Sequence, residues 1–586
     1  MDKEKEELQH KARHTASHVL AGAIKSLFGE DVKFGIGPAI EDGFYYDFDM
    51  EESLTPEDFE KIETKMHEII NQNLDMTKEV ISKQEALEMF KNQPYKVELI
   101  NDLPENEEIS IYKLGDVFTD LCKGPHVENT KMLRNFAFKI NRVSGAYWRG
   151  SEKNKMMQRI YVYGFLDKQD LKEHLALVKE AQERDHRKLG KDLGIFMFSD
   201  LVGRGLPMWL PNGFIVRRAL SDYIMDKEIA LGYKHVMTPS LATVDLYKTS
   251  GHWDHYHEDM FPSMKREDDD EEYVLRPMNC PHHMMIYKNF MHSYKDLPLR
   301  IAEIANDFRF EGSGSLCGIE RARAFTQNDS HIFCRPDQIE SEVDNVIKLI
   351  LDVYKDFGFQ KYSFRLSLRD ENNAEKYFGN DELWEKSENA LRKILQDSGA
   401  EFYEAKGEAA FYGPKIDVQV RSALGHDVTL STVQLDYQLP EKFELEYVDE
   451  NNERVRPVVI HRAILGSLDR FVAFLLEETK GVLPLWLAPV QIEILPISDK
   501  FIDKCKDVEM ELKKQGFRVE LDERNEKIGY KIRSAISQKI PYILVMGENE
   551  INNGTVSVRV RGTNESKEMK IEEFISFAKL KLENRE

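Results

Sequence analysis

The chain has 586 residues, more than one hydrophobic core accommodates, and this length predicts about three or four domains. Its 41% hydrophobic and 32% charged residues exclude a fibrous or a disordered protein, and no apolar run is long enough for a membrane span. The formal net charge of −23 argues against indiscriminate polyanion binding, although a local basic surface can still hold RNA. The first residues resemble neither a signal peptide nor a transit peptide, so we expect a cytoplasmic protein.

Four segments with different patterns follow one another along the chain. Residues 1–168 mix helical and strand patterns, and residues 169–193 form a charged helical run that we interpret as a linker. Residues 194–484 have the pattern of a long α+β section, with strands such as "LRIAEIANDFRF" and "AFTQNDSHIFC". Residues 485–586 alternate strand and helix, which predicts a compact α/β domain. One of its helices places three isoleucines on one face: Ile528, Ile532 and Ile536.

Two pairs of potential metal ligands occur in the first segment. His14 and His18 in "HTASH" share one helical face, roughly opposite the apolar residues of the same helix, so they are not expected to fill the core. Cys122 and His126 follow in "DLCKGPH". On spacing alone, HxxxH with CxxxH indicates a four-ligand zinc site.

Charged residues surround a flexible turn in "FRFEGSGSLCGIERARAFTQNDSHIFC", residues 308–334. Arg309, Glu311, Arg321 and Arg323 lie on what we interpret as two strands of a hairpin. Taken alone, arginines beside acids on a hairpin are most often surface ion pairs worth under ~1 kcal/mol each. Two further patterns change that interpretation.

The second pattern is "GYKHVMTPSL", where Pro239 ends an apolar strand after a long helix, and the third is "GSLDRFVAFLLEE", where Arg470 begins an apolar helix. In this order the three patterns resemble the signature motifs of class II aminoacyl-tRNA synthetases. Within that class the chain is similar to the threonyl-tRNA synthetase family, through "PMNCPHH", "FYGPKID", "STVQLDYQLP" and "VIHRAILGSLDRF". The resemblance covers essentially the entire chain.

The resemblance implies a multidomain α+β protein with three functional domains. An α+β editing domain would occupy residues 1–168, a class II antiparallel-sheet catalytic domain 194–484, and an α/β anticodon-binding domain 485–586, with the helical linker at 169–193. The family often carries a small ubiquitin-like domain before the histidine helix, which is absent from this sequence. Inside the hairpin three residues stand where many members carry proline, histidine and aspartate: Gly312, Cys317 and Asn328.

The implied activity is that of a threonine–tRNA ligase, which activates L-threonine with ATP, transfers it to tRNA(Thr) and hydrolyses mischarged Ser-tRNA(Thr). A homodimer formed through the motif around Pro239 is also implied. Two alternatives are a catalytically inactive, synthetase-like RNA-binding protein and a free-standing editing hydrolase. An inactive relative should have lost Arg309, Arg470 or a zinc ligand, and all of these are present.

The ATP site follows from the chemistry of adenylation, which needs fixed positive charge at the α-phosphate and at the leaving pyrophosphate. Arginine suits this role because its planar fork is permanently charged and binds phosphate bidentately. The resemblance assigns Arg309 to the α-phosphate, and Mg²⁺ is expected to accompany the phosphates. The other implied ATP contacts are Glu311 at the adenine edge, Phe325 stacked on the ring, Arg321 and Arg470 at the distal phosphates, and Gln434.

Five cysteines are too few and too scattered for a disulfide framework, so we expect reduced thiols available for packing or for metal. Cys280, His331 and His461 lie far apart, and by themselves they favour buried structural roles. The resemblance instead makes them the ligands of one Zn²⁺ per subunit with an open position. Zinc would recognise the hydroxyl of threonine. An apolar pocket alone would discriminate between threonine and valine by only about 100-fold.

The resemblance also implies contacts to the amino acid and to the tRNA terminus. Gln327 and Asp329 would hold the ammonium group of threonine. Tyr412 and Lys415 are either substrate contacts or, respectively, core packing and surface charge. His252 in "SGHWDHY" either assists transfer to the ribose or is an ordinary loop histidine.

Serine keeps the hydroxyl of threonine and lacks only a methyl, worth ~1–3 kcal/mol, so hydrolytic editing at a second site is expected. The resemblance implies a metal-free pocket, with proton handling by its lysine and aspartate. Since the spacing also indicates zinc, metal occupancy stays open here. The implied editing residues are His14, His18, Lys96, Asp120, Cys122 and His126, and those that would read anticodon bases are Asn525, Glu550 and Arg559.

Overall fold

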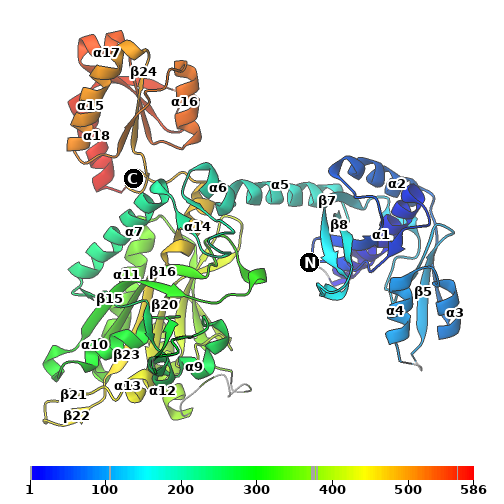
Figure 1. The fold of residues 1–586 in the computed structure, drawn as a ribbon, viewed down its shortest axis with the longest axis horizontal. Helices are drawn as coiled ribbons and strands as arrows, with labels where there is room; N and C mark the ends of the chain where they lie inside the picture. The colour runs from blue at the N-terminus through cyan, green and yellow to red at the C-terminus, as the bar shows by residue number, and fades with distance from the viewer. Residues whose placement is uncertain are drawn as a thin grey trace. The chain divides into compact units, whose positions relative to one another are not determined.

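The computed structural model describes residues 3–104, 107–268, 270–370, 372, 377, 381–563 and 565–585 (Figure 1). It divides into two compact units, Met1–Glu180 and Ala181–Glu586. Among these described residues, no helix combines the length and the apolar character needed to cross a membrane. The segment interpreted as a linker forms the helices α5 (Lys168–Arg184) and α6 (His186–Asp192), and the boundary between the units falls inside α5.

The amino-terminal unit contains two antiparallel sheets and one long helix. Its elements are α1 (Lys3–Phe28), β1 (Lys33–Phe34), β2 (Ala39–Ile40), β3 (Gly43–Asp49), α2 (Phe59–Asn71), β4 (Met76–Ile81), α3 (Lys83–Met89), α4 (Pro94–Asp102), β5 (Ile109–Leu114), β6 (Phe118–Leu121), β7 (Ala137–Tyr147) and β8 (Met156–Phe165). The larger sheet has the order β1-β3-β8-β7, with β2 paired to β3, and shares one apolar core with α1 and α2. The smaller sheet, β4-β5-β6, packs against α3 and α4.

The second unit is built around a large sheet and smaller strand pairs. Its elements up to the last domain are β9 (Phe196–Met197), β10 (Met208–Trp209), α7 (Pro211–Ala230), β11 (Lys234–His235), β12 (Leu241–Thr243), α8 (Val244–Ser250), α9 (His252–His255), β13 (Met264–Lys265), β14 (Glu272–Leu275), α10 (Cys280–Lys288), β15 (Leu299–Phe308), β16 (Ala324–Cys334), α11 (Ile339–Asp356), β17 (Tyr362–Leu368), α12 (Asp381–Ser398), β18 (Phe402–Lys406), β19 (Lys415–Arg421), β20 (Asp427–Asp436), α13 (Gln438–Lys442), β21 (Tyr447–Val448), β22 (Arg454–Val455), β23 (Val458–Ser467) and α14 (Leu468–Thr479). The strand order of the large sheet is β11-β15-β16-β23-β20-β19-β17-β18. Its pairs are antiparallel except β11 with β15 and β17 with β18.

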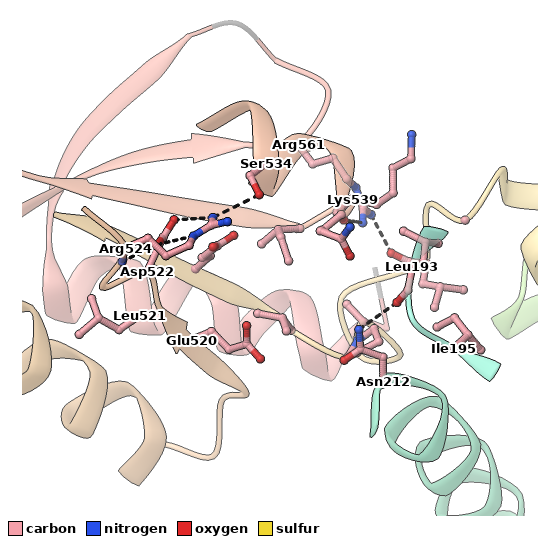
Figure 2. Close-up of a pocket in the computed structure, with 18 of the residues that line it drawn as sticks. Leu193, Ile195, Asn212, Glu520, Leu521, Asp522, Arg524, Ser534, Lys539 and Arg561 are labelled. Atoms are coloured by element: carbon pink, nitrogen blue, oxygen red, sulfur yellow. Dashed lines mark hydrogen bonds and ion pairs between the residues drawn. The ribbon is translucent and has the colours of Figure 1, made fainter. Parts of the chain in front are cut away.

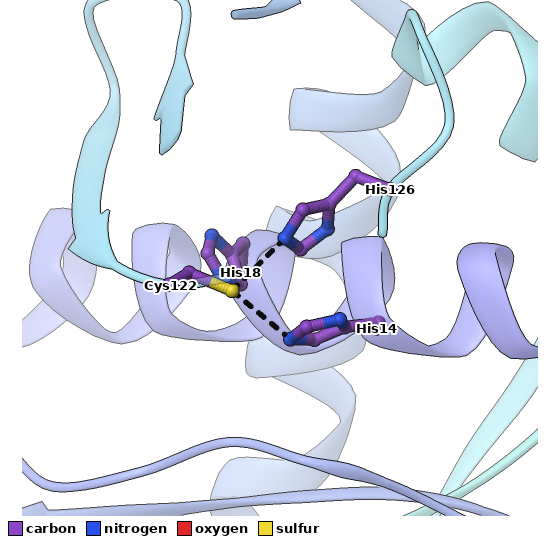
Figure 3. Close-up of side chains that lie close together, drawn as sticks. All are labelled: His14, His18, Cys122 and His126. Carbon is purple, nitrogen blue, oxygen red and sulfur yellow. Dashed lines mark hydrogen bonds between the residues drawn. The ribbon is translucent and has the colours of Figure 1, made fainter. Parts of the chain in front are cut away.

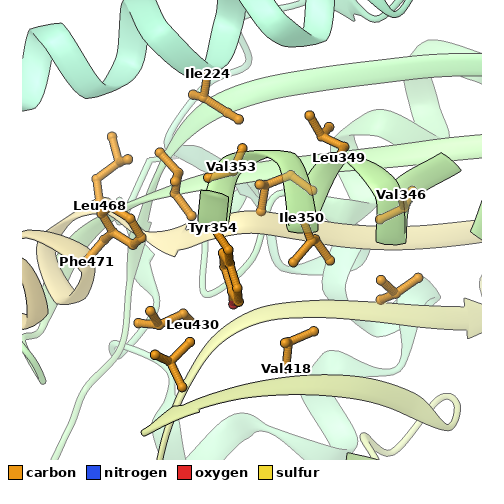
Figure 4. Close-up of a cluster of buried hydrophobic side chains, with 14 of the residues drawn as sticks. Ile224, Val346, Leu349, Ile350, Val353, Tyr354, Val418, Leu430, Leu468 and Phe471 are labelled. Atoms are coloured by element: carbon orange, nitrogen blue, oxygen red, sulfur yellow. The ribbon is translucent and has the colours of Figure 1, made fainter. Parts of the chain in front are cut away.

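One face of this sheet is sealed by helices, which leaves the other face for polar side chains. Figure 4 shows α11 residues such as Ile350 and Val353 packed above Val418 and Leu430 of the sheet. Along β16 the residues alternate between the two faces, so Ile332 lies in this core and its neighbours point the other way. Burying a side chain of this size contributes about 1.5–3 kcal/mol, so the core fixes the orientation of each strand.

The last domain is a five-stranded sheet with helices on it. Its elements are β24 (Ile492–Pro496), α15 (Ile502–Lys514), β25 (Val519–Leu521), α16 (Ile528–Ser537), β26 (Tyr542–Met546), α17 (Glu548–Asn553), β27 (Thr555–Val560), β28 (Ser566–Lys570) and α18 (Ile571–Glu583), in the strand order β25-β24-β26-β27-β28. Ile528 and Ile532 pack against Leu495, as the helical pattern predicts. Ile536, in the last turn of the same helix, is 50% exposed.

A buried ion pair joins α7 to the sheet. Oε1 of Glu228 lies 2.5 Å from Nη1 of Arg462, and Nδ2 of Asn328 donates to the same oxygen over 2.8 Å. Burial alone would raise the pKa of the Glu228 carboxyl, but the charge of Arg462 and the hydrogen bonds around it lower that pKa. Such a pair adds little net stability, yet removing one partner leaves a buried charge uncompensated.

We therefore expect Glu228→Ala to lower the free energy of unfolding by about 3–5 kcal/mol, because Arg462 would lose its counter-charge. Urea unfolding followed by tryptophan fluorescence measures the change. The matched control is Asp222→Ala on the same helix, which removes an exposed pair with Arg218. It should cost less than ~0.5 kcal/mol. Equal effects of the two substitutions would contradict the importance of the buried pair.

Candidate functional sites

A cavity of about 390 Å³ opens on the polar face of the large sheet. Its walls come from the start of α10, the loop after β15, β16, the segment before β19, β19, β20, β23 and the start of α14. The predicted site residues that line it are Cys280, Arg309, Glu311, Arg321, Phe325, Gln327, Asp329, Tyr412, Lys415, Gln434, His461 and Arg470. Segments up to about 190 residues apart in the sequence therefore meet in one pocket, as folded antiparallel sheets allow.

Three arginines concentrate positive charge in this cavity. Arg309 follows β15, and its guanidinium lies 5.0 Å from the ring centre of Phe325, with Nε buried and without a hydrogen-bond partner. Arg470 lies in the first turn of α14. Burial lowers the pKa of Arg470, and the charges of Arg309 and Arg321 lower it further. A polyanion in the cavity would relieve both the repulsion and the unsatisfied donor.

The remaining polar residues of the cavity are held by one another. Nη2 of Arg321 lies 2.8 Å from the Glu311 carboxylate across the loop. Nζ of Lys415 lies 3.0 Å from Asp417, a residue that sequence reasoning missed. Gln434 donates from Nε2 to the carbonyl oxygen of Gly413 over 3.1 Å. The loop and the sheet thus keep these side chains at the cavity before any ligand arrives.

Cys280, His331 and His461 come together beside the cavity, which Cys280 and His461 line. They lie at the start of α10, on β16 and on β23, and their ligand atoms are all within 4.8 Å of one another. The register explains the meeting, because His331 lies directly opposite His461, which lies opposite Gln434 of β20. Burial raises the pKa of the Cys280 thiol well above its usual value, with Asp329 adding to the effect.

This cluster has the features of a metal site. Nε2 of His331 is buried and has no hydrogen-bond partner. Nε2 of His461 lies 2.9 Å from Asp436, which leaves the other ring nitrogen for a ligand. One sulfur and two imidazole nitrogens are the donor types that zinc prefers, so the residues fit zinc with one position open.

Two predicted contacts of the amino acid lie beside this cluster, and one residue does not reach the cavity. Asp329 points to the same side of the sheet as His331, and its Oδ2 lies 3.7 Å from Nε2 of His331. The ring centre of Tyr412 lies 5.1 Å from that of His461. His252 is fully buried and packs edge-on against Phe411. Burial, together with the nearby His461, lowers the pKa of His252 to about 3, so this imidazole is neutral.

In the amino-terminal unit, His14, His18, Cys122 and His126 form a second cluster (Figure 3). Sγ of Cys122 lies 3.3 Å from Nε2 of His14 and 3.2 Å from Nε2 of His126, and all four ligand atoms are within 4.8 Å of one another. The sequence placed His18 away from the core, yet it is only 1% exposed, because β6 and the loop after it cover that face of α1.

A buried polar network adjoins this second cluster. Asp120 on β6 forms an ion pair with Lys96 of α4 and lies 3.7 Å from Nε2 of His18. Tyr46 of β3 donates to Asp120 over 2.6 Å and lies 3.2 Å from Nζ of Lys96. Sequence reasoning missed Tyr46, since its only signal was the buried alternation of "GFYYDFD". Burial lowers the pKa of His18 well below its usual value, so a neutral base faces the network.

The residues predicted to read anticodon bases lie on three separate elements. Asn525 is in the loop before α16, Glu550 in α17 and Arg559 on β27. Oε2 of Glu550 accepts a hydrogen bond from the backbone of Gly547 over 2.9 Å, which caps its own helix. A cavity of about 540 Å³ in the same unit lies between β24, β25 and residues near α7 (Figure 2), and none of these three lines it.

Three protein-family models match the chain. The class II core domain of the G, H, P, S and T tRNA synthetases matches residues 263–479, and an anticodon-binding domain matches 491–581. The second additional domain of threonyl and alanyl tRNA synthetases matches 109–161. These matches confirm the predicted fold class.

Relatives of known activity cover nearly the whole chain. The threonine–tRNA ligase of Staphylococcus carnosus is 56% identical over 96% of this chain and 86% of its own length. The enzyme of that name from a Geobacillus strain is also 56% identical, over 97% of this chain and 88% of its own. The solved RNA-binding domain of threonyl-tRNA synthetase from Cryptosporidium parvum is 38% identical with a TM-score of 0.64, covering 68% of this chain and 98% of that one. The chain therefore belongs to the threonyl-tRNA synthetase family, within the class II aminoacyl-tRNA synthetases.

Proposed function

We propose that the protein attaches L-threonine to tRNA(Thr) at the expense of ATP and hydrolyses the mischarged product Ser-tRNA(Thr). The observation that carries the ligase activity is the cavity in which Arg309, Arg321 and Arg470 meet beside a Cys/His cluster. Three fixed cations suit a triphosphate, and the neighbouring donors suit a small amino acid. Neither alternative, an inactive RNA-binding relative or a free-standing hydrolase, requires a cavity lined by three arginines beside a Cys/His cluster.

In the first step a carboxylate oxygen of threonine attacks the α-phosphorus of ATP, and the bond to the β-phosphate oxygen breaks to release pyrophosphate. Arg309 neutralises the charge that develops on the α-phosphate, and Arg321 and Arg470 hold the leaving phosphates. Glu311 and Phe325 hold adenine, with Arg321 released from Glu311 as the nucleotide binds. ATP enters with its Mg²⁺.

Arg309→Ala should slow threonine-dependent exchange of pyrophosphate into ATP by at least about 100-fold, because it removes a preorganised charge from the reacting phosphate. Exchange of labelled pyrophosphate at saturating threonine measures the rate. Arg421→Ala is the control, since Arg421 lies on β19 of the same sheet and pairs with the exposed Asp427. An exchange rate within a few-fold of the unchanged protein would rule out the assigned role.

We propose one zinc ion per subunit, held by Cys280, His331 and His461. Bound zinc would coordinate the amino and hydroxyl groups of threonine and so exclude valine, which lacks the hydroxyl. The chain's own contribution is to hold the ammonium group with Asp329 and Gln327 and to enclose the side chain with Tyr412. Lys415 lies at the outer part of the same cavity, beside Asp417.

Removal of zinc with a chelator, or the substitution Cys280→Ser, should abolish threonine activation. Any residual activity should favour threonine over valine by no more than about 100-fold, the limit of an apolar pocket. The measurements are metal content by mass spectrometry and exchange rates with each amino acid. Cys334→Ser is the control, since Cys334 is equally buried but faces the apolar core. Purified active protein without zinc would sink this proposal.

For the second step we propose that His252 assists transfer of threonine to the tRNA ribose. Its Nε2 has no partner, whereas Nδ1 lies 2.8 Å from Oγ of Ser250. Because the ring is buried behind Phe411, this role requires the short helix α9 to move when tRNA binds.

We propose that the cluster around Cys122 in the amino-terminal unit is the editing site. Serine passes the synthetic site because it lacks only a methyl group, so hydrolysis must follow. The neutral His18 and the pair Lys96 and Asp120 are suited to activate water and to move a proton to the departing ribose oxygen. Tyr46 holds Asp120 in place. The same four donors also fit a metal ion, so the number of zinc ions per chain distinguishes a metal-free from a metal-dependent hydrolase.

Replacing His14 and His18 together with alanine should slow deacylation of pre-formed Ser-tRNA(Thr) by at least about 100-fold and leave threonylation near normal. The reason is that the proposed editing residues all belong to Met1–Glu180, whereas the residues that line the arginine-rich cavity all belong to Ala181–Glu586. His10→Ala, one helical turn earlier and exposed, is the control. A metal-dependent site would lose one zinc equivalent in the double variant as well. Unchanged deacylation would return these histidines to a structural role.

We further propose a homodimer that works in the cytoplasm, where tRNA is charged. The motif around Pro239 exposes unusual apolar surface, since Met237 is 96% and Phe214 on α7 is 60% exposed. Paired subunits would cover these side chains. The last domain would bind the anticodon through Asn525, Glu550 and Arg559, whose polar side chains suit unpaired bases.

A further inference from the structure

A chain of hydrogen bonds leads from Thr238, the residue before Pro239, to one of the proposed zinc ligands. Thr238 donates from its backbone N to Oε1 of Glu303 over 2.9 Å and from Oγ1 to Oε2 over 2.8 Å. Oε2 of Glu303 lies 3.1 Å from Nε2 of His283, and Nδ1 of His283 lies 2.8 Å from Nδ1 of His331. Glu303, His283 and His331 are each at most 2% exposed, so water does not compete for these bonds.

The direction of each proton follows from the carboxylate at one end. An ionised Glu303 only accepts, so Nε2 of His283 carries its proton toward Glu303. Nδ1 of a neutral His283 is then an acceptor, and Nδ1 of His331 must donate to it. The lone pair of His331 is left on Nε2, the atom that is buried without a hydrogen-bond partner. Since Nδ1 of His331 is engaged with His283, Nε2 is the ring nitrogen left for a metal, in a group whose ligand atoms lie within 4.8 Å of one another.

His283 is better suited to orient a ligand than to be one. Its Nδ1 is occupied by His331 and its Nε2 by Glu303, so neither ring nitrogen is free. Among the residues that the structure describes, the group of ligand atoms that could hold a metal here contains Cys280, His331 and His461 but not His283. His461 obtains the same support directly, since Asp436 faces its Nε2 and is itself held by the backbone N–H groups of Gln438 and Leu439.

We propose that His283 and Glu303 are positioning residues of the zinc site: they fix the tautomer and the ring orientation of His331, and so set the affinity for the metal. This inference rests on the zinc site proposed above. It goes beyond that site because it identifies two side chains that are not ligands but orient the ligand His331. Such partners orient a ligand and raise its basicity, and their loss typically weakens metal binding by about 10–100-fold.

The test compares three substitutions on α10 in the full-length chain. His283→Ala removes the relay, and His283→Asn keeps an acceptor near the position of Nδ1 but loses the bond to Glu303. His282→Asn is the matched control, since the neighbouring His282 feels the charge of Glu303 but, within the described part of the chain, forms no hydrogen bond or ion pair with Glu303 or His331. All three are made in the variant that lacks His14 and His18, so that the amino-terminal cluster takes up no zinc.

Zinc dissociation constants from competition with a chromophoric chelator are the main measurement, and pyrophosphate exchange at increasing zinc is the second. We expect His283→Ala to weaken zinc binding about 10–100-fold, His283→Asn to weaken it less, and His282→Asn to leave it unchanged. Saturating zinc should restore exchange in both His283 variants, because the ligands themselves remain.

Each other outcome overturns the proposal in a recognisable way. Wild-type affinity in His283→Ala would remove the positioning role and leave the zinc site intact. Failure to bind zinc at any concentration, in a variant whose circular dichroism is unchanged, would make His283 a ligand. If His283→Ala does not fold, affinity in His283→Asn equal to that in His282→Asn would overturn the relay. A parent protein that binds no zinc would overturn both this inference and the zinc site.

Discussion

The register of four neighbouring strands, β15, β16, β23 and β20, determines which of their side chains meet at the arginine-lined cavity and the Cys/His cluster beside it. It places Asp329 opposite Glu303 on the neighbouring strand of the hairpin, and His331 opposite His461, which lies far away in the sequence. Side chains alternate between the faces of a sheet, so a slip of one residue would turn the whole polar set of β16 toward α11. The apolar residues on the other face prevent this, because each slip would expose them. Apolar packing on one face of the sheet therefore determines which polar side chains point to the other face.

Burial gives the site its electrostatic character and also makes it costly without ligands. The pKa of Arg470 is lowered and that of Cys280 is raised, both first because the groups are removed from water. Arg309 keeps a buried nitrogen without a partner, and so does His331. Elsewhere a fold avoids such groups, since each unpaired buried donor or acceptor costs free energy. Here a triphosphate and a metal ion would pair with these groups, so ligand binding would offset the free energy that their burial costs on folding.

The sequence predicted the parts of the site that lie in continuous motifs. Arg309 and Arg470 were identifiable because each belongs to a recognisable local pattern of strand, loop or helix. Cys280, His331 and His461 have no informative spacing, and only the resemblance suggested that they belong together. The partners beyond these were not predictable, since Glu303 meets His283 through the register of a sheet and through the position of a helix. Local sequence patterns do not predict such long-range contacts.

The same limit applies in the amino-terminal unit. Helical periodicity placed His14 and His18 on one face correctly, but it could not reveal that β6 and its loop cover that face and bury His18. Tyr46 reaches Asp120 from a strand in the other sheet of that unit. In both units the missing information is long-range packing, which decides whether a polar side chain becomes a solvated residue or part of a reactive network.

Two of the three departures of this chain from its family's hairpin pattern, Gly312 and Asn328, have physical explanations in the structure. Gly312 stands where many members carry proline, and its φ of −60° is the value that a proline ring would impose. Glycine thus allows the same loop conformation. It lacks only the stabilisation of about 0.4–1 kcal/mol that proline gives by reducing the conformational entropy of the unfolded chain. Asn328 stands where many carry aspartate, and its Nδ2 donates to Glu228, which an ionised carboxylate could not do. Both residues are compatible with the backbone path that places Arg309, just after β15, and Asp329, on β16, at the cavity.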